Sequence, residues 1–239
     1  MHNDKITGIQ HVSFDFWITL IRTHPEFKRE RAALFCRFFS VTDVEATEKV
    51  IRKVDLMANH INDLTGGNLQ PLELYLLVLQ EVHPDWKSIS LQDLETFYTA
   101  TGKLFGAYMP LPVDDTVELA LNMLLERGIT MNILSNTGFI KGHILRKSLE
   151  QLGWTNFFSF TVFSDETGHS KPHHAMFEKV WEDVKKRGEL LNKPDVLHLG
   201  DNPVADIEGA KKFGFSSALF LPGKGTFYQQ LSKAINPNG

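Results

Sequence analysis

Several polar residues that could perform chemistry stand directly after apolar segments of strand length. Asp15 follows "IQHVSF", Ser135 follows "ITMNIL", and Lys171 stands in "SDETGHSKP". Asp201 and Asp206 both lie in "HLGDNPVADIEGA". A carboxylate nucleophile with a hydroxyl, an ammonium group and two further carboxylates suits attack on an electrophilic phosphorus or carbon atom near a hard cation. The metal and the ammonium group would neutralise the repulsion between an anionic nucleophile and an anionic substrate.

These residues can meet only if the strands that precede them are parallel neighbours in one sheet. From residue 111 onward the sequence alternates between helical and strand-like segments. The expected helices are 114–128, 142–153, 173–188 and 204–214, and the expected strands are 129–135, 160–164, 195–200 and 216–221. This alternation predicts an α/β fold with a Rossmann-like parallel sheet, in which ligands bind beyond the carboxyl ends of the strands.

A long helical segment interrupts this pattern after the first strand. Residues 25–105 have helical periodicity and no convincing strand. Thr42 with Glu45 matches a capping box at the start of the second helix, "TGGN" ends that helix, and Pro71 suits the first turn of the third. We therefore expect a Rossmann-like core of residues 1–22 and 108–239 and an inserted all-α cap of residues 23–107.

Composition limits the partners of the protein. Of its 239 residues 42% are hydrophobic and 23% charged, and no apolar run is long enough to cross a bilayer. The net charge of −4 gives no basic excess for a nucleic acid, so a small-molecule partner is expected. The polar start "MHNDKITGIQ" and the single cysteine, Cys36, favour a cytoplasmic location. Nothing in the sequence predicts an oligomeric state.

In this order, the motifs resemble those of the haloacid dehalogenase-like (HAD) hydrolase superfamily. The resemblance covers the whole core, and the helical segment is similar to a cap inserted directly after the first motif. It implies that Asp15 is a nucleophile that forms an aspartyl intermediate and that Lys171 stabilises the charges. It also implies that Ser135 binds the phosphoryl oxygen, and we expect Asn136 and Thr19 to help bind the substrate.

The resemblance further implies a Mg²⁺ cofactor. Its ligands would be Asp15, Asp201 and the backbone carbonyl of Trp17. Asp206 would contribute through water or by orienting Lys171. The expected function is therefore a Mg²⁺-dependent hydrolase, namely a phosphatase of a small phosphorylated metabolite.

Trp17 departs from the pattern of the phosphatases in this superfamily. In those enzymes the residue two positions after the nucleophile is a second Asp, which protonates the leaving alcohol and later activates water. Here it is Trp17, and Ile18 replaces the usual glycine. An indole N–H does not shuttle protons at neutral pH, so only the backbone role of this position is retained. General acid–base help is worth about 10²–10⁴-fold in rate, so its loss must be compensated or the leaving group must not need it.

Three interpretations of Trp17 remain open. The haloacid dehalogenases tolerate an aromatic residue there because halide leaves unprotonated, yet they lose the metal-binding Gly-Asp pair that this sequence keeps as Gly200 and Asp201. A phosphatase could act on a leaving group of low pKa, or take a proton from the cap, with His24 and His60 as candidates. A degenerate member would bind a ligand with little turnover.

Overall fold

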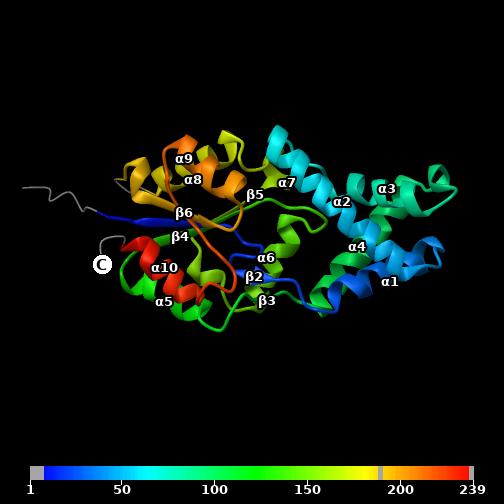
Figure 1. The fold of residues 1–239 in the computed structure, drawn as a ribbon, viewed down its shortest axis with the longest axis horizontal. Helices are drawn as coiled ribbons and strands as arrows, with labels where there is room; N and C mark the ends of the chain where they lie inside the picture. The colour runs from blue at the N-terminus through cyan, green and yellow to red at the C-terminus, as the bar shows by residue number, and fades with distance from the viewer. Residues whose placement is uncertain (1–7, 188–190, 237–239) are drawn as a thin grey trace, which may run out of the picture.

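The computed structural model describes residues 8–187 and 191–236, and a five-stranded parallel sheet lies at its centre (Figure 1). The strands are β1 (His11–Phe14), β4 (Thr130–Ser135), β5 (Phe160–Phe163), β6 (Val196–Gly200) and β7 (Ser216–Leu219), in the order β5-β4-β1-β6-β7. Phe14 at the end of β1 lies opposite Ile133 and Leu199, so the carboxyl ends of the three central strands are level. The predicted α/β class is confirmed. Residues 1–7, which belong to the polar start "MHNDKITGIQ", lie outside the described residues.

Helices cover both faces of this sheet. Helices α8 (His174–Lys186) and α9 (Gly209–Phe213) lie on one face, and α5 (Val117–Glu126), α6 (Gly142–Gln151) and α10 (Phe227–Ile235) pack on the other (Figure 1). Successive residues of a strand point to opposite faces, so Ile133 joins the core under α5 and Leu134 the core under α8. Both faces are therefore largely apolar, although His11, Asn132 and His198 are buried within the strands and hydrogen-bonded there.

The remaining short elements connect the larger ones. They are α7 (Ser164–Thr167), the 3₁₀-helices η1 (Trp86–Ser88), η2 (Thr155–Phe157) and η3 (Lys193–Asp195), and the π-helix η4 (Pro203–Glu208). The α-helix expected over 204–214 is thus wrong in its first half, because the side chain of Asn202 accepts hydrogen bonds from Val204 N and Ala205 N and the next turns are π-helical. No helix in the described ranges is long and apolar enough to cross a bilayer.

Helices α1 (Phe27–Phe39), α2 (Val44–Thr65), α3 (Pro71–Val82) and α4 (Leu91–Ala107) form a helical unit beyond one end of the sheet (Figure 1). Its core is aromatic: the ring of Phe97 lies 5.4 Å from that of Phe35 and 4.8 Å from that of Tyr75. All three side chains are fully buried. A separate apolar cluster of this kind supports the proposed division into a core of residues 1–22 and 108–239 and a cap of residues 23–107.

The ends of these helices follow local sequence rules with one exception. Gly66 ends α2 in a left-handed conformation and Pro71 begins α3, as expected. The expected capping box of Thr42 and Glu45 is wrong, because α2 begins one residue later. Asp43 is the N-cap, and its carboxylate accepts a hydrogen bond of 2.9 Å from Ala46 N. A carboxylate at this position also complements the positive end of the helix dipole.

The two segments that join the helical unit to the sheet lie side by side. Strands β2 (Ile21–Arg22) and β3 (Leu111–Pro112) pair antiparallel, and Val113 N donates to Leu20 O at 2.9 Å. A second contact lies after α2, where Ser170 N donates to Gly66 O at 2.9 Å. The helical unit is therefore fixed to the sheet both at its covalent joints and at the end of α2.

The turn between β1 and β2 contains a strained residue. Ile18 has φ of 66°, and its backbone N–H donates to Ile21 O at 2.7 Å. A β-branched residue is disfavoured in this left-handed region, whereas glycine adopts it freely. The conformation explains why related phosphatases are expected to have glycine here. The side chain is 52% exposed, so packing compensates little for the strain.

We predict that Ile18→Gly leaves the stability of the protein unchanged or raises it by up to about 1.5 kcal/mol. The relief of about 1–2 kcal/mol of left-handed strain exceeds or balances the greater chain entropy of unfolded glycine, about 0.5–1 kcal/mol. Leu56, which is also 52% exposed but lies within α2, provides the control. Leu56→Gly should lower stability by about 1 kcal/mol. Equal losses in urea-induced unfolding for both variants would contradict the assignment of strain.

Candidate active site

A buried ammonium group joins the polar residues at the strand ends. Lys171 Nζ donates to Asp15 Oδ1 at 2.8 Å, to Asp206 Oδ1 at 2.6 Å and to Leu134 O at 2.7 Å. Its side chain is 1% exposed. Three acceptors satisfy all three hydrogens of an ammonium group, so Lys171 is held in one position between the two carboxylates. The expected convergence of these residues at one edge of the sheet is therefore observed.

The charges of this cluster depend on one another. Burial alone would lower the pKa of Lys171, but Asp15 and Asp206 raise it above its usual value. Burial alone would raise the pKa of Asp206, but Lys171 and His198 hold it well below its usual range. For Asp15, burial prevails over Lys171 and raises the pKa. The Lys171–Asp206 pair is thus ionised, while the nucleophile candidate Asp15 is the less stabilised carboxylate.

Neighbouring side chains fix both members of this pair. Asn136 Oδ1 accepts from Lys171 N at 2.7 Å, and Asn136 Nδ2 donates to Lys171 O at 2.9 Å. Asn136 thus positions the lysine, and it also lines the cavity, so the expected substrate contact stays a prediction. His198 Nε2 lies 3.0 Å from Asp206 Oδ1. A Cβ at Gly200 would lie 2.2 Å from the Asp206 carboxylate, so only glycine allows this approach.

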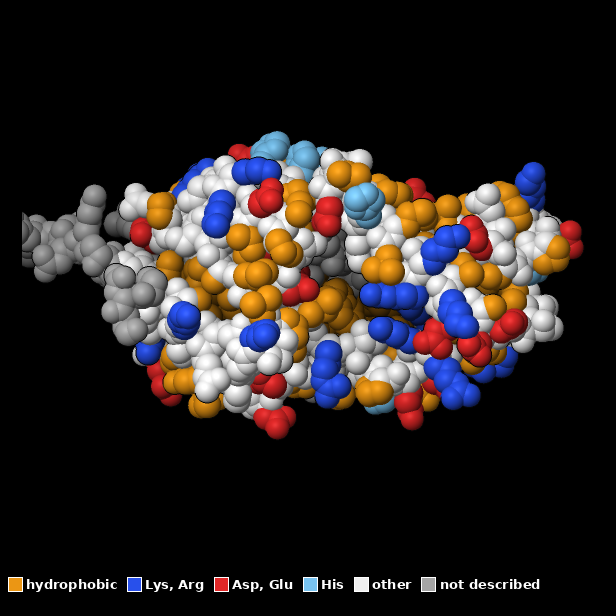
Figure 2. Space-filling view, in the orientation of Figure 1, with side chains coloured by type: hydrophobic (Ala, Val, Ile, Leu, Met, Phe, Trp, Pro, Cys, Tyr) orange, Lys and Arg blue, Asp and Glu red, His pale blue; other side chains and the backbone are white. Residues whose placement is uncertain are grey.

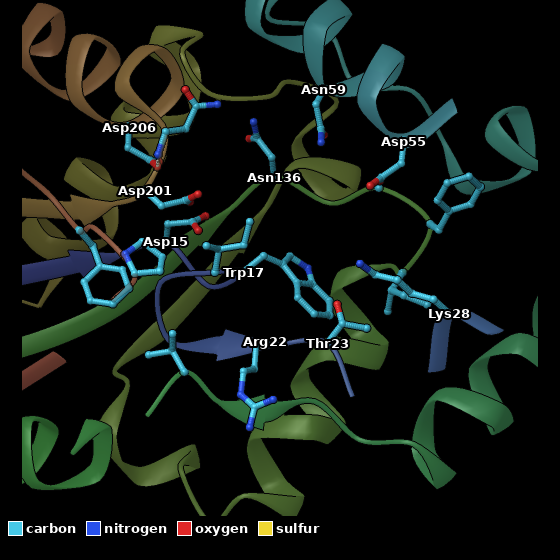
Figure 3. Close-up of a pocket in the computed structure, with 18 of the residues that line it drawn as sticks. Asp15, Trp17, Arg22, Thr23, Lys28, Asp55, Asn59, Asn136, Asp201 and Asp206 are labelled. Carbon is cyan, nitrogen blue, oxygen red and sulfur yellow. Dashed lines mark hydrogen bonds between the residues drawn. The ribbon is translucent and has the colours of Figure 1, made fainter. Parts of the chain in front are cut away.

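Three carboxylates are arranged to share a cation. One oxygen each of Asp15, Asp201 and Asp206 lie within 4.8 Å of one another, and Figure 3 shows them grouped at one end of the site. Burial, with repulsion from Asp15 and Asp206, raises the pKa of Asp201 to about 7. Oxygen ligands around an excess of negative charge suit a hard divalent cation such as Mg²⁺. The residues therefore fit the expected metal, although Lys171 already occupies one oxygen of Asp206.

The other expected site residues differ in their placement. Ser135 Oγ donates to Asp15 Oδ1 at 3.2 Å, so it lies beside the candidate nucleophile. Trp17 is half-buried, and its ring packs 6.1 Å from that of Phe105 in α4. Thr19 is fully buried and its hydroxyl has no hydrogen-bond partner in the described part of the chain. Thr19 is absent from the cavity lining, so its placement does not support substrate binding.

A cavity of about 890 Å³ lies between the strand ends and the helical unit, and Figure 2 shows the hollow there. Its lining includes site residues expected from the sequence and others that no motif indicated. Among the latter, the polar residues from β2, the segment after it and the helical unit are Arg22, Thr23, Lys28, Arg31, Arg52, Asp55, Asn59 and Asp63. His24 and His60, considered as proton donors, are not among the lining residues.

The fold and this site place a candidate carboxylate nucleophile, Asp15, at the end of a parallel sheet beneath a helical unit. A model of haloacid dehalogenase-like hydrolases matches residues 9–214. The chain belongs to this family.

Individual relatives agree with the family. A ribulose-1,5-bisphosphate 5-phosphatase of Halopiger xanaduensis is 31% identical over 158 residues, which are 66% of this chain and 62% of that protein. The chain thus matches less than two thirds of that relative's length. The HAD hydrolase YfnB of Bacillus subtilis, solved with magnesium bound, has a TM-score of 0.66 and 17% identity over 91% of both chains. A 2-haloacid dehalogenase of Pseudomonas syringae has a TM-score of 0.64 and 18% identity over 97% of this chain and 100% of that one. The two structures share the fold of this chain.

Because folding raises the pKa of Asp201 from 3.8 to about 7, the folded protein binds its proton more tightly than the unfolded chain does. Without metal, this residue lowers stability as pH rises from about 4 to 7. We predict that Asp201→Asn melts at a higher temperature than the wild type at about pH 8 in chelator, by an amount on the order of a few degrees.

The difference should shrink as pH falls and disappear below about pH 3, where Asp201 is protonated in both states. Added Mg²⁺ should raise the melting temperature of the wild type more than that of Asp201→Asn. Asp115, an exposed carboxylate outside the cavity lining, provides the control, and Asp115→Asn should behave as the wild type. A wild type that melts at the same temperature with and without Mg²⁺ would contradict the metal assignment.

Proposed function

We propose that this hydrolase is a Mg²⁺-dependent phosphatase of a small phosphorylated metabolite and that it acts through an aspartyl-phosphate at Asp15. The observation that carries this proposal is the convergence of Asp15, Asp201 and Asp206 around the buried ammonium group of Lys171. The similarity to a phosphatase at 31% identity supports phosphate-ester chemistry. The magnesium in the structure of the Bacillus subtilis neighbour supports the choice of cation.

The residues have distinct roles in this proposal. A carboxylate oxygen of Asp15 attacks phosphorus, and the bond between phosphorus and the leaving oxygen breaks. Water then hydrolyses the acyl phosphate, which releases inorganic phosphate and restores Asp15. The Lys171 ammonium offsets negative charge on the nucleophile, and the Ser135 hydroxyl donates to a phosphoryl oxygen. Lys171 also restrains Asp15 through their hydrogen bond of 2.8 Å.

The Mg²⁺ ion would be held by Asp15, the backbone carbonyl of Trp17 and Asp201, with Asp206 in support. Bound there, it would supply positive charge that neutralises the phosphoryl oxygens. Asp206 already accepts hydrogen bonds from Lys171 at 2.6 Å and from Asn202 N at 2.9 Å. Its main role is therefore to orient Lys171, which was one of the two roles expected from the sequence.

A carbon–halogen hydrolase is the alternative, favoured by Trp17 and by the shared fold of a 2-haloacid dehalogenase. The third carboxylate, Asp201, argues against it, because halide displacement needs no metal to neutralise an anionic phosphoryl group. A panel of phosphate esters, acyl phosphates and 2-haloacids, assayed with Mg²⁺ and with chelator, separates the two. We expect phosphate release only with Mg²⁺. Halide release that persists in chelator would overturn the proposal, and no turnover of any compound would indicate a ligand-binding protein.

Because the Trp17 side chain transfers no proton, we predict unusually strong dependence on the leaving group. Aryl and acyl phosphates should exceed alkyl phosphates in kcat/KM by more than their intrinsic reactivity. Trp17→Asp should raise turnover of alkyl phosphates selectively, by up to about 10²-fold, since it restores a proton donor. Asp15→Asn should abolish turnover of every substrate.

Trp17→Asn is the matched control, since it enlarges the cavity as Trp17→Asp does but carries no acid. It should leave the dependence on the leaving group unchanged. If Trp17→Asp, while folded, also leaves that dependence unchanged, another group already supplies the proton. Asp63 would then be the first residue to replace, because it lines the cavity from α2 and burial raises its pKa.

A further inference from the structure

One cation in the cavity wall lacks a counter-charge. Arg31 of α1 lines the cavity, and its guanidinium carbon lies 4.8 Å from the ring centre of Phe139 and 5.4 Å from that of Phe27. Its Nε is buried without a hydrogen-bond partner, and no ion pair of Arg31 occurs among the described residues. The hydroxyl of Tyr75 is an uncharged neighbour: burial raises the pKa of Tyr75, and the charge of Arg31 and its hydrogen bonding oppose that rise. The two rings hold a guanidinium group that the protein leaves unpaired.

Two further unpaired cations line the same cavity. Lys28 precedes Arg31 by three residues, so both lie on one face of α1. Arg22 comes from β2. Neither has an ion pair with any residue in the described ranges, and both are exposed. In Figure 3, Trp17 lies between Lys28 and the acidic cluster. Figure 2 shows Lys and Arg side chains along the rim of the hollow on the side of the helical unit.

The carboxylates in this part of the wall already have partners. Asp55 pairs with Arg52 at 2.9 Å. Asp63 accepts from Asn202 Nδ2 at 3.3 Å. Asp114 accepts from Thr116 N at 2.8 Å and from Phe227 N at 2.7 Å. None of these carboxylates forms an ion pair with Lys28 or Arg31, so both cations are available to a ligand. A guanidinium group already held against two aromatic rings loses less side-chain entropy when an anion binds it than a free one would.

We propose that the substrate carries a second anionic group, a phosphate or a carboxylate, which binds Arg31 and Lys28 while the scissile phosphoryl group lies at Asp15. The proposal rests on the proposed phosphatase function and adds the substrate class. The cavity has an acidic end that takes a metal-bound phosphoryl group and a cationic end beyond Trp17 that takes the second anion. Its volume of about 890 Å³ accommodates a metabolite that carries charge at both ends.

Two matched pairs of substrates test the second charge and its source. Fructose 6-phosphate and fructose 1,6-bisphosphate differ by one phosphate, and glycerol 3-phosphate and 3-phosphoglycerate differ by a carboxylate in place of a hydroxymethyl group. In at least one pair, the compound with two anionic groups, fructose 1,6-bisphosphate or 3-phosphoglycerate, should have the lower KM. Arg31→Met and Lys28→Met should each raise that KM by about ten- to a hundredfold, with little change in kcat or in the KM of the singly anionic member.

Arg29→Met is the matched control, because Arg29 is an exposed cation on the same helix that does not line the cavity. It should leave every KM unchanged. If Arg31→Met fails to fold, Lys28→Met still tests the proposal, because the side chain of Lys28 is exposed and its replacement disturbs little packing. Hydrolysis with equal KM within both pairs, or equal effects of Arg29→Met and Lys28→Met, would overturn the second-anion proposal alone.

Absence of hydrolysis of all four compounds in Mg²⁺ would instead count against the phosphatase function. Calorimetric binding of the same compounds to Asp15→Asn tests the second anion without turnover. Tighter binding of a doubly anionic member, lost in the double variant with Arg31→Met, is the expected result. Equal binding within both pairs would again overturn the second-anion proposal.

Discussion

The burial of Lys171 between Asp15 and Asp206 is the constraint on which the rest of the site depends. A buried ammonium group costs several kcal/mol unless its charge is compensated and its hydrogens are bonded. Here two carboxylates and a backbone carbonyl provide that compensation. These acceptors come from three different strands or the segments that follow them, so the ammonium group links the carboxyl ends of β1, β4 and β6. The same interaction that stabilises the sheet edge therefore assembles the chemistry.

A charge imbalance follows from this arrangement. Lys171 compensates one of three clustered carboxylates, so Asp15, Asp201 and Asp206 leave two negative charges in excess when all are ionised. Burial raises the pKa values of Asp15 and Asp201, and repulsion within the cluster adds to the rise. Protonation of a carboxylate relieves the excess negative charge in the free protein. A divalent cation would also relieve it, and it would leave Asp15 ionised. The fold itself thus favours metal binding over a neutral site.

The sequence predicted the sheet and the acidic end of the site, but not the cationic end. Asp15, Ser135 and Asp201 follow apolar strands, and parallel strands bring their carboxyl ends together whatever the loops do. Arg31 and Asp63 face the cavity only because α1 and α2 dock over the strand ends, and helical periodicity does not reveal a docking direction. The wrong prediction at the start of α2 has a local cause. Thr42 and Asp43 can both serve as N-cap, and Asp43 does so because a carboxylate also complements the helix dipole.

Trp17 connects the two ends of the cavity, and its identity changes more than proton transfer. An Asp at this position would leave open space between the carboxylates and the helical unit. The indole ring instead packs against Phe105 of α4 and lies between the acidic cluster and Lys28 (Figure 3). A large rigid side chain there sets how far the scissile group lies from whatever binds Arg31 and Lys28. If the proposed function and the second-anion proposal hold, the residue that removes the general acid also sets the spacing to which the substrate's two charged groups must match.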